Sequence, residues 1–251
     1  MNGERTPDEG RIEGKNAVME ALKAGRTIDK VYVARGEQDK LMRFIIQKAK
    51  AAGAVVSEVD RRKLDFMSQT HAHQGVIAVA AVREYATVES ILEIARERGE
   101  KPLVVICDEI SDPHNLGAII RTAETAGAHG VIITKHRSAG ITAIVEKTSA
   151  GAVEHMAVAR VVNLSAAIEK LKQNGVWVFG TAAEGDKGLW DADFKDAAAI
   201  VIGSEGDGMS RLTRESCDFL VSIPMHGKIS SLNASNAAAV VLYEAVRQRS
   251  L

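Results

Sequence analysis

The sequence has few cysteines, and none of its apolar segments is long enough to cross a membrane. Only two cysteines, Cys107 and Cys217, occur among 251 residues, which excludes a disulfide framework and favours a reducing compartment. The longest apolar stretches, such as residues 75–82, are far shorter than the ~18 residues that a membrane span needs. The N-terminal residues contain no apolar signal region. We therefore expect a cytoplasmic protein.

Aromatic residues are also scarce, and the charges are unevenly distributed. Aromatics make up 4% of the chain, which disfavours an extended platform for stacking nucleic-acid bases. Residues 1–83 carry 15 Lys and Arg against 11 Asp and Glu, whereas residues 84–251 carry 17 against 22. A basic first third beside an acidic remainder indicates a polyanion-binding module attached to a second unit. Chance scatter of solvated charges explains these numbers equally well.

The first third of the chain predicts a small α/β domain. Residues 1–10 are polar and are expected to form a flexible tail. Residues 11–83 are predicted to form the substrate-binding domain, and residues 84–101 form one charged amphipathic helix that is expected to serve as a linker. Within the domain, helices are predicted over residues 16–22, 40–52 and 61–67. Strands are predicted over residues 30–34 and 75–82, and a further strand begins at residue 54.

Residues 102–251 predict a second α/β domain with a mostly parallel sheet. Helices and strands alternate along it, which is typical of a helix-covered parallel sheet. In such sheets ligands bind beyond the carboxyl ends of the strands, so the loops there are the candidate sites. Strands are predicted over residues 103–107, 131–134, 156–161, 176–180, 198–202 and 219–223, and helices over 115–127, 141–149, 165–174, 209–217 and 234–249.

The loop after the predicted strand 103–107 contains a turn signal followed by two candidate polar residues. Asn115 is predicted to cap the next helix. Arg121 lies six residues further on and is expected to lean back over the N-terminal end of that helix, where it forms a phosphate-binding corner. A salt bridge from Arg121 to Glu124 or Glu205 is the structural alternative, and the residues themselves favour neither.

Two later loops are unusually rich in glycine or in small polar residues. Residues 203–208 contain three glycines around Glu205, but they match neither the dinucleotide fingerprint nor the P-loop. This disfavours a nicotinamide-dependent dehydrogenase. The loop at 223–237 carries more polar side chains than one helix cap requires, which indicates a small-molecule or RNA contact. These side chains are Ser230, Ser231, Asn233, Ser235 and Asn236.

Together the three loops resemble the three motifs of the SpoU/TrmH family of RNA ribose 2'-O-methyltransferases, in the SPOUT superfamily. The segments are DPHNLGAIIRTAETAG, IVIGSEGDGMS and SIPMHGKISSLNASNAAAVVLYEA. The first domain is similar to the family's RNA-binding substrate module, which is related to a ribosomal-protein fold. The resemblance implies an α/β catalytic domain with a trefoil knot over residues 102–251, a homodimer, and S-adenosylmethionine as cofactor. It further implies methylation of a guanosine in large-subunit (23S) rRNA.

The resemblance also assigns site residues. It implies catalytic roles for Asn115, Arg121, Glu205, Ser231 and Asn233, and cofactor binding at Gly203, Gly206, Ile223, Met225 and Leu232. A guanidinium is protonated at any physiological pH, since its pKa lies above ~12, so Arg121 is a poor general base. We expect Arg121 instead to grip the target phosphate and to stabilise charge developing on the 2'-oxygen. No metal site is expected, because the pair His71 and His73 has no third ligand nearby.

Other targets and functions stay open from the sequence. A tRNA or another rRNA site is the alternative within the family, and the first domain favours rRNA because the tRNA guanosine enzymes generally lack it. A non-catalytic RNA-binding protein of ribosome assembly is the alternative outside enzymology. Loss of Arg121 or Asn233 would support that alternative, and both residues are present.

Overall fold

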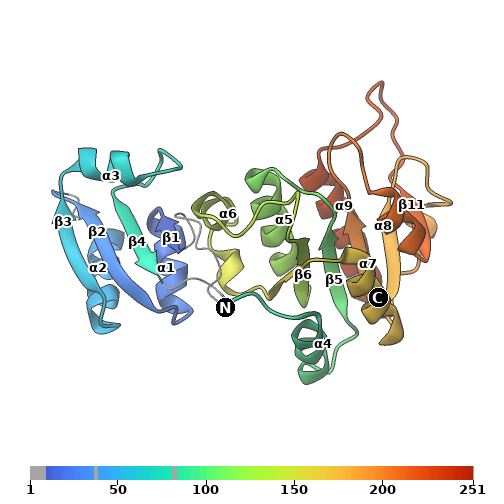
Figure 1. Cartoon of the computed structure of the whole chain (residues 1–251), viewed down its shortest axis with the longest axis horizontal. Helices are drawn as coiled ribbons and strands as arrows, with labels where there is room; N and C mark the ends of the chain where they lie inside the picture. The colour runs from blue at the N-terminus through green and yellow to red at the C-terminus, as the bar shows by residue number, and fades with distance from the viewer. Residues whose placement is uncertain (1–9, 37–38, 81–83, 251) are drawn as a thin grey trace. The chain divides into compact units, whose positions relative to one another are not determined.

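The computed structural model describes residues 10–36, 39–80 and 84–250, which fall into two units (Figure 1). Unit 1 contains the chain up to Glu84 together with Ile141–His155, and unit 2 contains Tyr85–Gly140 and Met156–Leu251. The flexible tail expected at residues 1–10 lies outside the described residues except for Gly10.

Unit 1 is built on a sheet with the described strand order β1-β4-β2-β3. Strand β4 runs antiparallel to β1 and β2, whereas β2 and β3 are parallel. Side chains alternate across the sheet, so Val31 and Val33 face the core that α1 and α2 cover. Leu64 of α3 packs on the other face, against Ala34 and Ile77. The elements are β1 (Arg11–Glu13), α1 (Lys15–Lys23), β2 (Ile28–Ala34), α2 (Lys40–Ala51), β3 (Val55–Val59), α3 (Arg61–Met67) and β4 (Val76–Ala80).

A short helical segment from the middle of the chain also belongs to unit 1. It comprises α6 (Ala143–Thr148) and the 3-10 helix η1 (Ala152–Glu154). The buried guanidinium of Arg26 lies 2.5 Å from a carboxylate oxygen of Glu146 and 2.9 Å from one of Glu154. Burial opposes the charge on Arg26, but the two carboxylates prevail and raise its pKa. The segment thus packs in unit 1, which differs from the linear division into domains that the sequence predicts.

Unit 2 contains a sheet whose neighbouring strands are all parallel, in the order β7-β6-β5-β10-β8-β11-β9 among the described residues. Helices α5 (Pro113–Thr125) and α9 (Ala234–Arg249) pack on each other and against β6 and β10 (Figure 1). The remaining elements are β5 (Leu103–Cys107), β6 (Gly130–Thr134), β7 (Val158–Val161), α7 (Leu164–Gln173), β8 (Trp177–Thr181), β9 (Lys187–Gly188), η2 (Leu189–Asp191), β10 (Ala198–Ile202), α8 (Arg211–Ser216) and β11 (Phe219–Ser222).

The helix predicted as a linker at residues 84–101 packs inside unit 2. It forms α4 (Val88–Glu97), which begins with a capping box between Thr87 and Ser90. Its apolar face, including Ile91, joins the core that α7 and the sheet share. A Cβ atom at Gly130 would lie 2.5 Å from the Ile91 side chain, so glycine at that position gives α4 its close approach to the sheet. Helix α4 is therefore a structural layer of unit 2.

No helix in the described part of the chain is long and apolar enough to cross a membrane.

Candidate active site

A pocket of about 850 Å³ lies at the carboxyl ends of β8, β10 and β11. Its walls are the loops that follow these strands, at residues 181–184, 202–209 and 221–232. This is the position at which open parallel sheets bind ligands, and the volume is typical of a small-molecule site. The pocket therefore lies where the strand order predicts a ligand site.

A closed turn built from glycines forms one wall of the pocket. The backbone N–H of Ser204 donates to the Gly208 carbonyl at 2.9 Å, and the Gly208 N–H donates to the Ser204 carbonyl at 3.1 Å. Gly208 adopts a φ of 69°, in the region that favours glycine. A Cβ atom at Gly203 would lie only 2.3 Å from the backbone of Gly208 and Met209. The turn therefore requires glycine at both of its ends, and it holds Glu205 between them.

The turn is fixed to the end of strand β5 by Asp108, a residue that sequence reasoning did not single out. Asp108 is buried directly after β5, and its carboxylate accepts a hydrogen bond from the backbone N–H of Ser210 at 2.7 Å. Ser210 in turn caps α8, because its hydroxyl accepts from the Thr213 backbone N–H. Asp108 could have been identified from the sequence by its position directly after a predicted buried strand.

Three polar side chains from the three predicted motifs form one hydrogen-bonded cluster. The Asn115 amide nitrogen donates to Glu205 Oε1 at 2.9 Å, and the Asn233 amide nitrogen donates to Asn115 Oδ1 at 2.9 Å. The Asn233 amide also donates to Glu205 Oε1. We call these three residues the Asn–Glu–Asn cluster. It brings together residues that are up to 118 positions apart in the chain.

The orientation of the Asn233 amide follows from its role as the cap of α9. Its Oδ1 accepts hydrogen bonds from the backbone N–H of Ser235 at 3.0 Å and of Asn236 at 3.3 Å. Because the oxygen must face these donors, the amide nitrogen is left to face Glu205 and Asn115. The helix cap thus positions the cluster.

Asn115 does not cap α5, contrary to the sequence prediction. Asp112 is the cap, and its carboxylate accepts from the His114 backbone N–H at 2.9 Å. Pro113 occupies the first helical position, where its missing N–H leaves no hydrogen bond unmade. The helix therefore begins earlier than predicted, and the side chain of Asn115 is available to the cluster.

Arg121 is exposed on α5 and stands apart from the cluster. It comes six positions after Asn115, which places it roughly 120° away around the helix axis. Among the described residues, its guanidinium forms no hydrogen bond or ion pair, so the salt bridge to Glu124 or Glu205 that was the structural alternative is absent. Arg121 likewise makes no hydrogen bond to the Asn–Glu–Asn cluster at the start of α5, where the phosphate-binding corner was predicted.

The other predicted site residues surround the pocket. Ser231 lines it, as do the cofactor candidates Gly203, Gly206, Ile223, Met225 and Leu232. The sequence analysis did not predict the wall at residues 181–184. That loop follows a predicted strand, and ligands of parallel sheets bind beyond the carboxyl ends of the strands, so its position was the available signal.

The two cysteines are poor nucleophiles. Cys107 is fully buried, and burial raises the pKa of its thiol to about 12. Burial likewise raises the pKa of Cys217 to about 12, and its sulfur donates to the Thr213 carbonyl. Both thiols therefore stay protonated near neutral pH, as expected for core cysteines. Among the described residues, no group of three or more His, Cys, Asp or Glu lies together as a metal site would require.

Comparison with known proteins assigns this architecture. The SpoU rRNA Methylase family model matches residues 102–243, and the model of the RNA 2'-O ribose methyltransferase substrate-binding domain matches residues 11–86. The chain belongs to the SpoU methylase family. It is 46% identical to YacO of Bacillus subtilis, assigned to the TrmH family of tRNA/rRNA methyltransferases, over 95% of each chain.

Solved structures of other family members resemble the whole chain. One is the SpoU methyltransferase AviRb from Streptomyces viridochromogenes in complex with AdoMet, with a TM-score of 0.84 and 29% identity over 96% of this chain and 91% of that one. Another is an AdoMet-bound rRNA methyltransferase from Sinorhizobium meliloti, with a TM-score of 0.78 and 26% identity over 96% and 87%. A trefoil knot is typical of this fold.

As a SpoU methylase, the chain is an RNA methyltransferase that uses S-adenosylmethionine. The pocket fits that cofactor. Glycines of the turn line one side, where the backbone can approach a ligand closely, and the half-exposed Met225 and Leu232 add apolar surface. Apolar surface beside closely approaching backbone suits an adenosine, which has both a polar edge and flat apolar faces.

Proposed function

We propose that this SpoU methylase transfers a methyl group from S-adenosylmethionine to the ribose 2'-hydroxyl of a guanosine in 23S rRNA, the activity of the family member RlmB. The observation that carries the proposal is the Asn–Glu–Asn cluster beside the pocket, on a chain that also has the substrate-binding domain. The cluster supplies a fixed carboxylate, and the pocket supplies the cofactor site. We place this activity in the cytoplasm.

The pocket loops would hold the cofactor. Backbone groups of Gly203, Ile223 and Leu232 would contact its adenosine, while Gly206 and Met225 complete the walls. When bound, the cofactor supplies an activated methyl group on sulfur. The protein must then hold the ribose oxygen in line with that methyl group.

The catalytic side chains would position and polarise the ribose hydroxyl. Two amide donors fix the carboxylate of Glu205, which would accept a hydrogen bond from the 2'-hydroxyl and increase its nucleophilicity. Ser231, on the wall of the pocket, would orient the ribose. Arg121 would grip the phosphate and stabilise charge developing on the 2'-oxygen, since its guanidinium is free of carboxylate partners among the described residues.

A homodimer formed through α5 and α9 would complete the site. Tyr243 of α9 is 51% exposed, and its hydroxyl reaches the Thr125 hydroxyl of α5 at 3.5 Å. Arg121 lies one helical turn before Thr125, on the same strip of α5. A dimer formed on this surface would bring Arg121 to the subunit boundary, which would explain why it does not contact its own cluster.

Two features favour rRNA over tRNA as the substrate. The substrate-binding domain is present, and an rRNA methyltransferase is similar to this chain over nearly all of its length. A tRNA target is the second candidate, because the family of the Bacillus relative includes both tRNA and rRNA methyltransferases.

Methyl transfer with purified components tests the proposal. The protein is incubated with methyl-tritiated S-adenosylmethionine and either 23S rRNA, 16S rRNA or total tRNA, and the RNA is digested to nucleosides. The proposal predicts label in 2'-O-methylguanosine from 23S rRNA. Label only in tRNA would establish the second candidate, and label on a base would contradict ribose methylation.

A further inference from the structure

Phe66 on α3 is the most exposed large apolar side chain among the described residues, with 92% of its surface accessible. Single exposed apolar residues are common, so its exposure alone indicates nothing. What distinguishes Phe66 is its setting, because the helix that carries it also carries the sequence Arg61-Arg62-Lys63.

Cations lie on the same side of α3 as Phe66. Arg62 and Lys63 precede it by four and three residues, which is the spacing of neighbours on one helix face. Neither residue forms an ion pair with a described carboxylate. The acidic residues of this region are otherwise engaged, since Asp60 caps α3 and Asp65 binds His73 at 2.9 Å.

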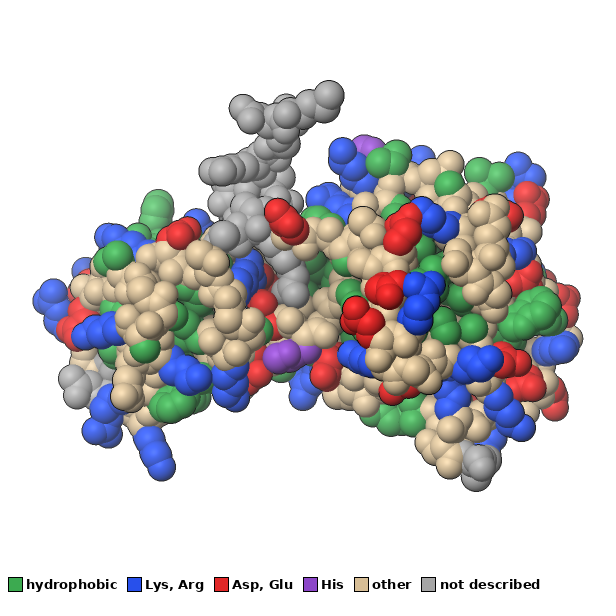
Figure 2. Space-filling model, turned by 90° about the horizontal axis from the view of Figure 1, so that it is seen from below, with side chains coloured by type: hydrophobic (Ala, Val, Ile, Leu, Met, Phe, Trp, Pro, Cys, Tyr) green, Lys and Arg blue, Asp and Glu red, His purple; other side chains and the backbone are tan. Residues whose placement is uncertain are grey.

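The adjoining sheet face continues this positive, aromatic surface. The amino groups of Lys30 and Lys63 lie 4.8 Å and 5.6 Å from the ring centroid of Tyr32, which is half-buried on β2. Val55 on β3, paired with Lys30, is 59% exposed because α3 leaves that end of the face uncovered. Figure 2 shows Lys and Arg side chains spread over another face of unit 1 as well.

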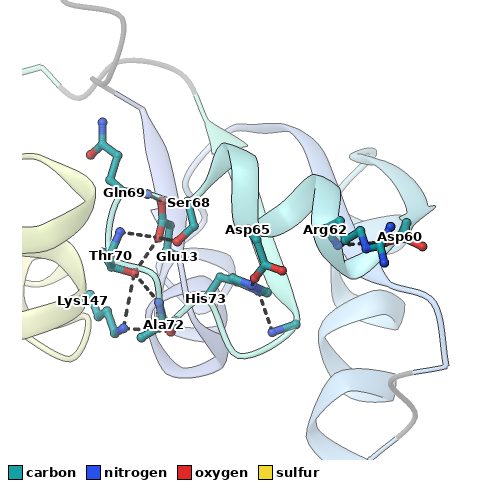
Figure 3. Close-up of polar contacts among 11 residues, drawn as sticks. Glu13, Asp60, Arg62, Asp65, Ser68, Gln69, Thr70, Ala72, His73 and Lys147 are labelled. Carbon is teal, nitrogen blue, oxygen red and sulfur yellow. Dashed lines mark hydrogen bonds and ion pairs between the residues drawn. The ribbon is translucent and has the colours of Figure 1, made fainter.

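Buried hydrogen bonds anchor the segment that follows α3 (Figure 3). Glu13 is fully buried just beyond the C-terminal end of α3, and it accepts hydrogen bonds from the hydroxyls of Ser68 and Thr70, both at 2.6 Å, and from the Gln69 backbone N–H at 2.8 Å. The Lys147 ammonium donates to the Ala72 carbonyl at 2.8 Å. The chain two residues beyond Phe66 is thus tied to β1 by buried hydrogen bonds.

We propose that Phe66 stacks on an unpaired base of the RNA substrate, while Arg62 and Lys63 contact the flanking phosphates. An exposed aromatic ring beside cations is the combination that recognises unpaired nucleotides, because stacking tolerates any base and phosphates supply the charge. The inference rests on the proposed RNA substrate and specifies its class: an RNA that presents an unpaired nucleotide. One exposed aromatic suffices for one base, which is consistent with the low aromatic content.

The test uses the full-length protein and two labelled RNA probes, a hairpin with unpaired purines in its loop and a fully paired duplex of equal length. Phe66→Ala is expected to weaken hairpin binding roughly tenfold while duplex binding stays unchanged, because only the stacked base is lost. The salt dependence of hairpin binding should not change, since Phe66 carries no charge, whereas Lys63→Gln should reduce the slope by about one.

Two matched variants separate stacking from general damage. Phe66→Trp keeps a flat ring and should restore hairpin affinity. Phe44→Ala removes a half-exposed aromatic with a lysine over its ring, on α2 across the sheet, and should bind the hairpin as wild type does. Since Phe66 is almost fully solvated, its replacement should leave the thermal unfolding temperature unchanged.

Several outcomes would overturn the inference. They are wild-type hairpin affinity in Phe66→Ala, equal losses on hairpin and duplex, or no recovery in Phe66→Trp. Failure of the proposed function is distinguishable, because it is measured as absent methyl transfer by the wild-type protein, and these binding measurements do not depend on transfer.

Discussion

At the scale of single residues, Gly203 shows how sterics shape the cofactor site. A Cβ atom there would lie 2.3 Å from backbone atoms of the glycine turn, and these atoms could move away only if the turn opened. We expect Gly203→Ala to weaken S-adenosylmethionine binding by about tenfold or more, which is about 1.4 kcal/mol. Calorimetry measures the affinity of the variant and of the wild type, and equal affinities would show that cofactor binding does not depend on the turn.

Arg121 tests the electrostatic part of the mechanism. Arg121→Lys keeps the charge but loses the planar pair of donors, and should lower turnover about a hundredfold, the scale of removing one preorganised donor. Cofactor affinity should be barely altered, because Arg121 does not line the pocket. Single-turnover methyl transfer with saturating RNA gives the rate. Turnover at the wild-type rate would mean that a point charge suffices and that the bidentate grip is wrong.

Glu13 makes the stability of unit 1 depend on pH. Burial opposes its ionisation, but hydrogen bonds from Ser68, Thr70 and the backbone of Gln69 prevail and lower its pKa. Because the pKa of Glu13 is lower in the folded than in the unfolded state, its stabilisation is complete above the unfolded-state pKa. The stabilisation disappears as the pH falls through the folded-state pKa. We expect Glu13→Gln to be less stable than wild type at pH 7, by about 1–3 kcal/mol, and the difference to shrink in acid. Urea unfolding from pH 7 down to pH 3 measures this, and a constant difference would contradict it.

At the scale of secondary structure, local sequence patterns predict most elements. The structure confirms the predicted boundaries of α3, β5, β10 and α9. It adds β1 and β9, which the sequence analysis missed because two or three residues are too few to show a period. The Asn–Glu–Asn cluster was predicted as a set of residues from family resemblance, but its hydrogen bonds join distant loops and no local pattern encodes them.

The placement of α6 shows where local patterns fail. Its helix is predicted from residues 141–149, but its packing in unit 1 depends on Arg26, 120 positions away from Glu146. Replacing Glu146 with alanine should destabilise unit 1 by about 3 kcal/mol, because a buried guanidinium loses one of its two carboxylates. Glu169→Ala, on the solvent side of α7, is the control. Differential scanning calorimetry checks the effect, and equal stabilities of the two variants would contradict it.

At the scale of the whole molecule, the match to the substrate-binding domain and the candidate cofactor pocket fall largely on different units. The basic first third of the sequence corresponds to most of unit 1, and the pocket lies entirely in unit 2. Deleting residues 1–84 is a less clean separation than the sequence suggests, because it removes the partners of α6 and exposes Glu146. Point variants on α3 and in the pocket separate the two roles without that damage.

The most direct test of the account is ribose-methylation mapping of rRNA and tRNA from cells with and without this protein. One 2'-O-methylguanosine in 23S rRNA is expected to disappear from the deletion strain. It should return with the wild-type gene but not with Asn233→Ala, whose loss removes a donor to Glu205. Unchanged ribose methylation in every RNA, or full restoration by Asn233→Ala, would contradict the account.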